Sequence, residues 1–176
     1  MNYWANMGCP YLVMILMNLK KILKMHNLVI ADTSCLIVLE QIGRLSLLKK
    51  LYDEIHITSE IKDEYGSELP GWITVAELID KQRQKILELN LDKGEASAIA
   101  LGLENEGSLL LIDEKKGRNL ALSLGLKITG TLGILIKAKN NSLISSLREE
   151  FDKLKNVGFW VSDKLLTQIL DKYENE

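Results

Sequence analysis

The sequence predicts an α/β fold, a three-layer α/β/α sandwich around a mostly parallel sheet, with an all-helical C-terminal part. Short continuous apolar runs, typical of strands buried on both faces of a parallel sheet, alternate with segments whose apolar residues recur at helical spacing. This alternation favours parallel strands joined by right-handed helical crossovers. No internal repeat, low-complexity tract or linker divides the 176 residues, so we expect one domain over residues 27–173.

The first half of the chain is expected to begin with a buried strand that runs directly into a helix. Gly43 closes this first helix, and Ser59 is expected to cap a later one. The apolar stripe of the first helix consists of Cys35, Val38, Leu39 and Ile42. The elements expected up to residue 66 are a strand at 28–31, helices at 34–43 and 45–52, a strand at 54–58 and a helix at 59–66.

The second half continues the alternation and then becomes helical. The clearest helix lies within residues 92–107, where Ala96, Ile99, Ala100 and Leu103 line one face. Beyond Thr131 we expect only helices, with a break at 140–141, because asparagine tolerates a left-handed backbone. The other elements expected are a short edge strand at 71–75, a polar helix near 77–89, strands at 108–113 and 126–129, and a helix at 118–125.

Composition excludes several classes of protein. Apolar residues make up 47% and charged residues 26%, as in an ordinary globular protein. The net charge of −2 excludes a broadly basic surface, so contact with nucleic acid would need a local patch. Two cysteines without a CxxC pair and two distant histidines argue against a zinc cluster, and they suit a reducing cytoplasm.

The N-terminal residues 1–26 are interpreted as an extension outside the fold. The apolar run at 9–17 is too short to span a bilayer, which takes about 20 residues. No lysine precedes the run and lysines follow it, which is the wrong order for a signal peptide. We therefore expect no membrane association, and Met25 is one of several possible alternative starts.

Two carboxylates lie at the carboxyl ends of predicted strands of the parallel sheet, Asp32 directly after the first and Asp113 at the end of the strand at 108–113. In open parallel sheets the ligand site lies beyond the carboxyl ends of the strands, so these carboxylates are expected to face one crevice. Asp32 is either a helix cap or a metal ligand. Ser34 is able to cap the following helix alone, which would leave Asp32 free.

Other acids flank the buried sides of helices that follow the strands. Glu95 stands three residues after Asp92 in a pattern typical of a capping box, but it also lies one turn before Ile99, beside the apolar stripe. Glu60 and Glu64 are four residues apart on one helix. Several carboxylates facing one crevice would repel one another unless a hard cation such as Mg²⁺ or Mn²⁺ bound there. Such a cation also suits phosphodiester chemistry.

Five segments in order make the chain resemble PIN-domain proteins, specifically a PIN-like group that is similar to the ribonuclease toxins of VapBC-type toxin–antitoxin pairs. The resemblance covers about residues 27–173, and it likens the tail "GFWVSDKLLTQIL" to the group's last helix. The segments that carry it are "IADTSCLIVL", "IKDEY", "LDKGEASAIAL", "LLLIDEKKGRNLA" and "GTLGILIKAK".

The resemblance implies a Mg²⁺- or Mn²⁺-dependent endoribonuclease that hydrolyses RNA phosphodiester bonds. Asp32, Glu95 and Asp113 would hold the metal. The second family acid falls on Glu64 in preference to Glu60, because it follows Ile61 by three positions. The implied catalytic residues are Asp32, Glu64, Glu95 and Asp113, and the implied auxiliary residues are Ser34, Glu114 and Arg118.

The resemblance also implies partners, namely an RNA substrate, a small antitoxin and a second copy of the chain. Lys115, Lys116 and Arg118 are the candidate RNA-binding patch, although the two lysines also fit a solvated helix start. Tyr65 and Trp72 are candidates for stacking on a base, but we favour a core or surface role. A homodimer through about residues 36–52 is expected from the excess of leucines there, unless these leucines complete the core.

Three other functions were weighed. An aspartyl phosphatase needs a second acid two residues after the first, where this chain has Ser34. A P-loop or dinucleotide site needs a glycine fingerprint after the first strand, and none is present. The remaining alternative is a catalytically inactive PIN-like binding or regulatory protein. This alternative would be excluded if the purified protein cleaved RNA and an Asp32→Asn variant did not.

Overall fold

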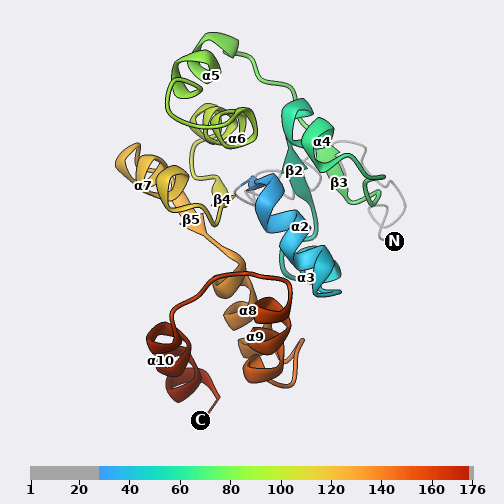
Figure 1. The fold of residues 1–176 in the computed structure, drawn as a ribbon. Helices are drawn as coiled ribbons and strands as arrows, with labels where there is room; N and C mark the ends of the chain where they lie inside the picture. The colour runs from blue at the N-terminus through green and yellow to red at the C-terminus, as the bar shows by residue number, and fades with distance from the viewer. Residues whose placement is uncertain (1–27, 175–176) are drawn as a thin grey trace, which may run out of the picture.

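The computed structural model describes residues 28–174, in which five parallel strands form one sheet with helices packed around it (Figure 1). The strand order is β3-β2-β1-β4-β5. The sequence-based prediction of an α/β/α sandwich with a helical C-terminal part is confirmed. The strands are β1 (Val29–Ala31), β2 (Ile55–Ile57), β3 (Ile73–Val75), β4 (Leu109–Leu111) and β5 (Lys127–Thr129).

The strand order reverses direction between β1 and β4, which is where an open parallel sheet forms its ligand crevice. The chain leaves β1 toward β2 on one side and leaves β4 toward β5 on the other. Ala31 pairs with Leu111, so the residues that follow both strands come out side by side. The backbone N–H of Asp32 continues the ladder and donates to the carbonyl of Leu111 at 2.9 Å.

The helices place further side chains at this crevice. Helix α6 packs against β1 and β4 and also contacts α4, α5 and α7, whereas α4 contacts both α2 and α6. Figure 1 shows α8, α9 and α10 gathered together, away from α5 and α6. The helices are α2 (Thr33–Gln41), α3 (Ser46–Tyr52), α4 (Ser59–Tyr65), α5 (Lys81–Leu87), α6 (Lys93–Glu104), α7 (Lys115–Ser123), α8 (Thr131–Asn140), α9 (Leu147–Asn156) and α10 (Asp163–Tyr173).

One local prediction was wrong, and another was confirmed only in part. Helix α4 is capped by Thr58, whose hydroxyl accepts the N–H of Ile61 at 3.3 Å, rather than by Ser59. The chain does break after α8, but Ser142 has the positive φ of 56° that was expected of an asparagine. In each case a neighbouring residue adopts the expected conformation: the residue before Ser59 caps the helix, and the residue after Asn141 has the positive φ.

The leucines that suggested a dimer interface lie in the protein's own core. Leu47 and Leu48 are buried on α3, and Leu45 and Leu51 pack against the core while staying partly exposed. The excess of leucines is therefore explained by the protein's own core, which was the alternative interpretation. These residues give no separate support to the predicted homodimer.

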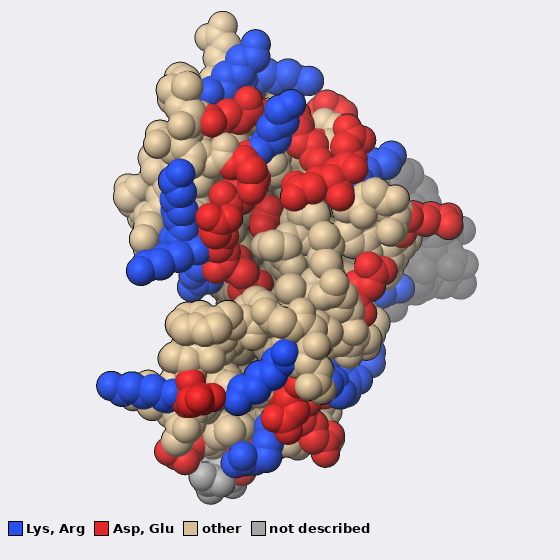
Figure 2. Space-filling model, in the orientation of Figure 1, with Lys and Arg blue, Asp and Glu red and all other residues tan. Residues whose placement is uncertain are grey.

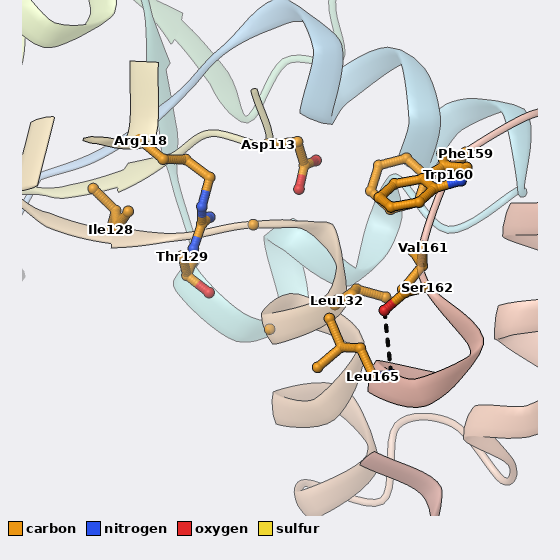
Figure 3. A pocket seen from close by; sticks show the side chains of 12 residues that line it. Asp113, Arg118, Ile128, Thr129, Leu132, Phe159, Trp160, Val161, Ser162 and Leu165 are labelled. Carbon is orange, nitrogen blue, oxygen red and sulfur yellow. Dashed lines mark hydrogen bonds between the residues drawn. The ribbon is translucent and has the colours of Figure 1, made fainter. Parts of the chain in front are cut away.

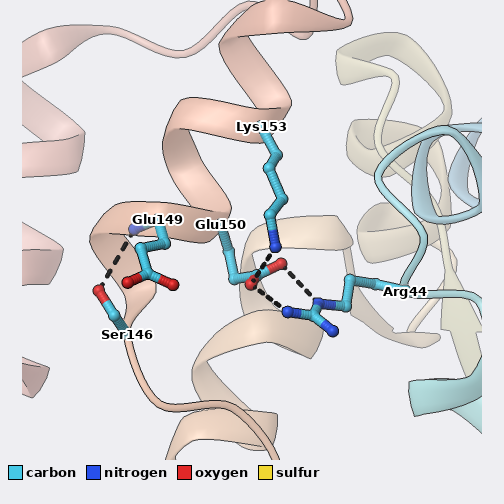
Figure 4. Close-up of polar contacts among 5 residues, drawn as sticks. All are labelled: Arg44, Ser146, Glu149, Glu150 and Lys153. Carbon is cyan, nitrogen blue, oxygen red and sulfur yellow. Dashed lines mark hydrogen bonds and ion pairs between the residues drawn. The ribbon is translucent and has the colours of Figure 1, made fainter.

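A partly buried ion pair joins the C-terminal helices to the rest of the molecule (Figure 4). Arg44, between α2 and α3, donates two hydrogen bonds to the carboxylate of Glu150 on α9, at 2.8 and 2.6 Å. Lys153 donates a third at 2.8 Å. Burial alone would raise the pKa of Glu150, but these bonds outweigh it and hold the pKa below its usual value. Glu150 is therefore charged and fully paired at neutral pH.

The predictions about the N-terminal extension fall on residues 1–26, which lie outside the described residues. Within the described residues, no helix is long and apolar enough to span a bilayer.

Candidate active site

Asp32 occupies the N-cap position of α2, but its side chain does not cap the helix. The carboxylate makes no capping hydrogen bond, although a backbone hydrogen bond from Thr33 lowers its pKa, and its Oδ2 atom accepts the hydroxyl of Ser34 at 2.6 Å. Ser34 is therefore not the cap either. Asp32 is 3% exposed, at the carboxyl end of a central strand. A buried carboxylate that is not used by the helix is available for chemistry.

Glu64 reaches the same region from α4. Its Oε2 atom accepts the hydroxyl of Thr33, the neighbour of Asp32, at 2.9 Å. The same atom lies against Gly94 at the start of α6, where a Cβ atom would overlap with it. Glu60, the alternative second acid, instead accepts a hydrogen bond from Gln84 on α5 at 3.1 Å. The structure thus places Glu64, rather than Glu60, beside Asp32.

Glu95, in the first turn of α6, is as buried as Asp32. Asp92 caps α6 as the sequence indicated, because its Oδ1 atom accepts the N–H of Glu95 at 2.8 Å. The side chain of Glu95 is only 3% exposed, and its Oε1 atom accepts no hydrogen bond from the described residues. Carboxylate oxygens of Asp92, Glu95 and Glu114 all lie within 4.8 Å of one another.

The crowding of these carboxylates changes their acidity. Burial, followed by the charges of Glu114, Asp92 and Asp32, raises the pKa of Glu95 to about 8. Burial also raises the pKa of Asp32 to about 6; the hydrogen bond from Ser34 opposes this shift, and the charges of Asp92 and Glu64 add to it. The raised pKa values are the expected result of burying carboxylates and, to a smaller extent, of holding like charges close together.

Asp113 lies beyond β4 at the same edge of the sheet, but its carboxylate is bound to the start of α8. Its Oδ1 atom accepts the backbone N–H of Thr131 at 2.9 Å, and its Oδ2 atom accepts the Thr131 hydroxyl at 2.5 Å. A Cβ atom on Gly130 would overlap with Oδ1. Cys35 bridges the two sides of the crevice, since its Sγ atom lies 3.4 Å from the Thr131 hydroxyl and both Asp32 and Asp113 raise its pKa, after burial.

The candidate RNA-binding residues lie at the start of α7 and point in different directions. Arg118 donates to the backbone carbonyl of Ile112 at 2.8 Å, in the turn that carries Asp113. Lys116 lines a shallow hollow with Asn90 on the other side of the helix, and Lys115 is exposed. Figure 2 shows acidic side chains gathered in a band that runs down the upper half of this face, with basic side chains projecting to the left of it.

The donor atoms fit a divalent cation. They are carboxylate oxygens only, which suits Mg²⁺ or Mn²⁺, and the buried Oε1 atom of Glu95 needs a positive partner. Sequence analysis had interpreted Asp92 only as a cap and had given Glu114 an auxiliary role, although both approach Glu95. The spacing of Asp92 and Glu95 was visible in the sequence, whereas the approach of Glu114 depends on the packing of α7 against α6.

Comparison with known families gives one match. A family model described as PIN domain matches residues 28–175, nearly the whole of the described chain. No curated protein and no solved structure matches the chain. The family match agrees with the observed fold, and PIN domains are generally nucleases.

Proposed function

The chain belongs to the PIN-domain family, and on this premise we propose that it is a Mg²⁺- or Mn²⁺-dependent endoribonuclease, the toxin of a toxin–antitoxin pair. The observation that carries the proposal is the buried Oε1 atom of Glu95, which has no hydrogen-bond partner among residues 28–174 and lies next to the carboxylates of Asp92 and Glu114. Leaving a buried polar atom without a partner costs about 1–3 kcal/mol, more if the group is charged. A cation at this position removes that cost and gives the site its chemistry.

We assign the metal to Asp32, Glu95 and Asp113, with Asp92 and Glu114 as additional oxygen donors. A bound Mg²⁺ or Mn²⁺ supplies an activated water and neutralises charge that develops on the phosphodiester. Ser34 holds Asp32 in place through the 2.6 Å hydrogen bond. Thr131 does the same for Asp113.

Glu64 has a separate part in the proposed mechanism. Its carboxylate is exposed at the rim of the site and is held toward it by Thr33. A carboxylate in this position orients the attacking water or accepts its proton. Arg118 stands at the opposite rim, beside Asp113, where a guanidinium binds the negative phosphate backbone.

RNA cleavage by the purified protein tests the proposal. Single-stranded RNA should be cut internally in Mg²⁺ or Mn²⁺, and the cutting should stop in EDTA and in an Asp32→Asn variant. Glu60→Gln is the matched control, because Glu60 is an acid of the same helix as Glu64 that binds Gln84 instead. If the wild-type protein cuts no RNA in either metal, the chain is an inactive PIN-like binding protein.

We also propose that a small antitoxin restrains the enzyme in the cytoplasm by inserting a basic side chain into the acid cluster. The band of acidic residues in Figure 2 is an electrostatic target for such a side chain. The homodimer through residues 36–52 stays a prediction, and light scattering after size-exclusion chromatography tests it. A monomer at tens of micromolar would contradict the dimer without affecting the nuclease.

A further inference from the structure

A hollow of about 380 Å³ borders the proposed active site on the side of Asp113 (Figure 3). Its volume falls within the range of about 300–1,000 Å³ that is usual for small-ligand sites. Two charged side chains, Asp113 and Arg118, lie on one side, and aromatic rings of the segment between α9 and α10 lie on the other. Leu132 and Leu165 contribute apolar walls. We call this feature the Trp160 hollow.

Trp160 is the exposed aromatic residue of this hollow. Its side chain is 85% exposed, while the residues on either side of it, Phe159 and Val161, pack against the core. This alternation is that of an extended segment whose successive side chains point in opposite directions. A tryptophan in water leaves a large apolar surface unburied, which is costly unless another group covers it in the working protein.

The backbone around Trp160 is held from both sides. The N–H of Phe159 donates to the carbonyl of Leu154 at 2.9 Å, which closes the end of α9 around Gly158 with its φ of 80°. On the other side, the hydroxyl of Ser162 accepts the N–H of Leu165 at 3.3 Å and caps α10. The indole is therefore presented to the hollow from a short segment that is fixed at each end.

We propose that the Trp160 hollow binds one unpaired nucleobase of the RNA substrate, stacked on the indole of Trp160, with an adjacent phosphate at Arg118. The proposal rests on the proposed nuclease function and names where the substrate lies. Asp113, which we assign to the metal above, also lines the wall of this hollow, so an occupant of the hollow would lie next to the proposed site of cleavage. A nucleotide has the two features that the walls require, a flat apolar face for Trp160 and a negative charge for Arg118.

The other aromatic residues considered for stacking do not offer such a surface. Tyr65 is only 7% exposed, and Trp72 packs against the core beside β3, the edge strand farthest from β5. Arg118 uses one of its N–H donors on the carbonyl of Ile112, which fixes the guanidinium at the rim of the hollow. A fixed donor beside a fixed ring gives a preformed nucleotide subsite, which binds with a smaller loss of conformational entropy.

Fluorescence of Trp160 tests the proposal directly. The chain has three tryptophans, so a Trp4→Phe, Trp72→Phe variant reports Trp160 alone. Asp32→Asn is added to prevent turnover, and hexa-adenylate is titrated in Mg²⁺. We expect the emission to be quenched. In a chain that already carries Asp32→Asn, adding Trp160→Ala should weaken binding of the oligomer, measured by calorimetry, about tenfold. Trp160→Phe should retain most of the affinity, and Trp72→Phe all of it.

An abasic hexanucleotide, which has the same phosphates but no bases, separates stacking from charge. It should bind at least tenfold more weakly than hexa-adenylate and should leave Trp160 unquenched. Equal binding of the two oligomers, or unchanged affinity in Trp160→Ala, overturns the proposal even if the enzyme cleaves RNA. Absence of quenching by any oligomer also overturns it and would assign the hollow to a protein partner. Quenching without RNA cleavage by the wild type would instead retain the subsite and reject the nuclease.

Discussion

The carboxylate of Glu95 lies against the backbone of Gly117, because a Cβ atom on Gly117 would stand only 2.6 Å from Oε1 of Glu95. The absence of a side chain on α7 thus makes room for the buried acid of α6. Two more carboxylates of the site lie against glycine backbones in the same way, Glu64 against Gly94 and Asp113 against Gly130. Glycines of α6 and α7 and the glycine that precedes α8 therefore shape the space in which these acids lie.

This relationship predicts that Gly117→Ala weakens metal binding without unfolding the protein. Alanine favours the helix by up to about 1 kcal/mol over glycine, which offsets part of the overlap with Glu95 and with Ile112. We expect Mn²⁺ affinity, measured by calorimetry, to fall at least tenfold. Gly102→Ala is the matched control, because its Cβ atom would meet only Leu126 and Ser108, away from the acids. Equal affinity in the two variants would contradict the prediction.

Divalent metal should stabilise the folded protein. A cation that binds only the folded state stabilises it by mass action, about 2.7 kcal/mol at one hundred times Kd. For a chain of this length the corresponding rise in Tm is about 5–10 °C. We expect this rise with millimolar Mn²⁺ relative to EDTA, and a smaller one in Asp113→Asn and Glu114→Gln variants. Identical melting curves with Mn²⁺ and EDTA would argue strongly against the metal site.

The raised pKa values make the stability of the metal-free protein depend on pH. Glu95 has a folded-state pKa of about 8 and Asp32 of about 6, both above their ordinary values of 4.5 and 3.8. The folded state therefore binds more protons than the unfolded state between about pH 4 and pH 8, so stability must fall as the pH rises through this window.

Denaturant unfolding in EDTA between pH 5 and pH 9 measures this effect. Each unit of pKa shift corresponds to about 1.4 kcal/mol, so we expect a loss of up to a few kcal/mol across the window. Glu95→Gln removes the group with the larger shift and should flatten the curve. A wild-type protein that gains stability between pH 5 and pH 8 would show that the acids are not crowded in solution.

Much of this architecture was predictable from the sequence because it depends on local patterns. Continuous apolar runs and helical periodicity are local, and the positions of Asp32 and Asp113 after two strands follow from them. The start of α7 was placed three residues late, at Arg118 instead of Lys115, because its first turn is polar. The tail was likened to a helix from residue 158, yet α10 begins at Asp163.

The features that were missed depend on tertiary packing. Asp92 was predicted to cap α6, and it does so. Its carboxylate also lies close to that of Glu114, which was not predictable because it requires α7 to pack against α6. Trp160 gave no signal in the sequence, since an apolar residue near a helix is normally buried. Its exposure follows from the turn that ends α9 and from the cap that begins α10, which leave an extended segment between them.

The ion pair of Arg44 and Glu150 should matter for stability rather than for activity. Removing Arg44 leaves the 1% exposed carboxylate of Glu150 with Lys153 as its remaining charged partner. We expect Arg44→Ala to lower the free energy of unfolding by about 2–3 kcal/mol, somewhat less than for a fully buried pair. Arg83→Ala, which breaks an exposed pair with Asp80, should change it by less than about 0.5 kcal/mol. Equal effects would mean that the Glu150 pair contributes no more than a surface contact.

The two glutamates of α4 provide the sharpest test of the catalytic assignment. Glu64 accepts the hydroxyl of Thr33 and lies against Gly94, whereas Glu60 accepts a hydrogen bond from Gln84 on α5. Glutamine has almost the same shape as glutamate but cannot accept a proton, so Glu64→Gln should lower kcat for RNA cleavage at least a hundredfold, the usual range for a general base. Glu60→Gln should retain kcat within about threefold, since its carboxylate contacts neither the acids nor the hollow in the described structure. A larger loss in Glu60→Gln than in Glu64→Gln would assign the second acid to Glu60 and would require α4 to turn its other face toward the site.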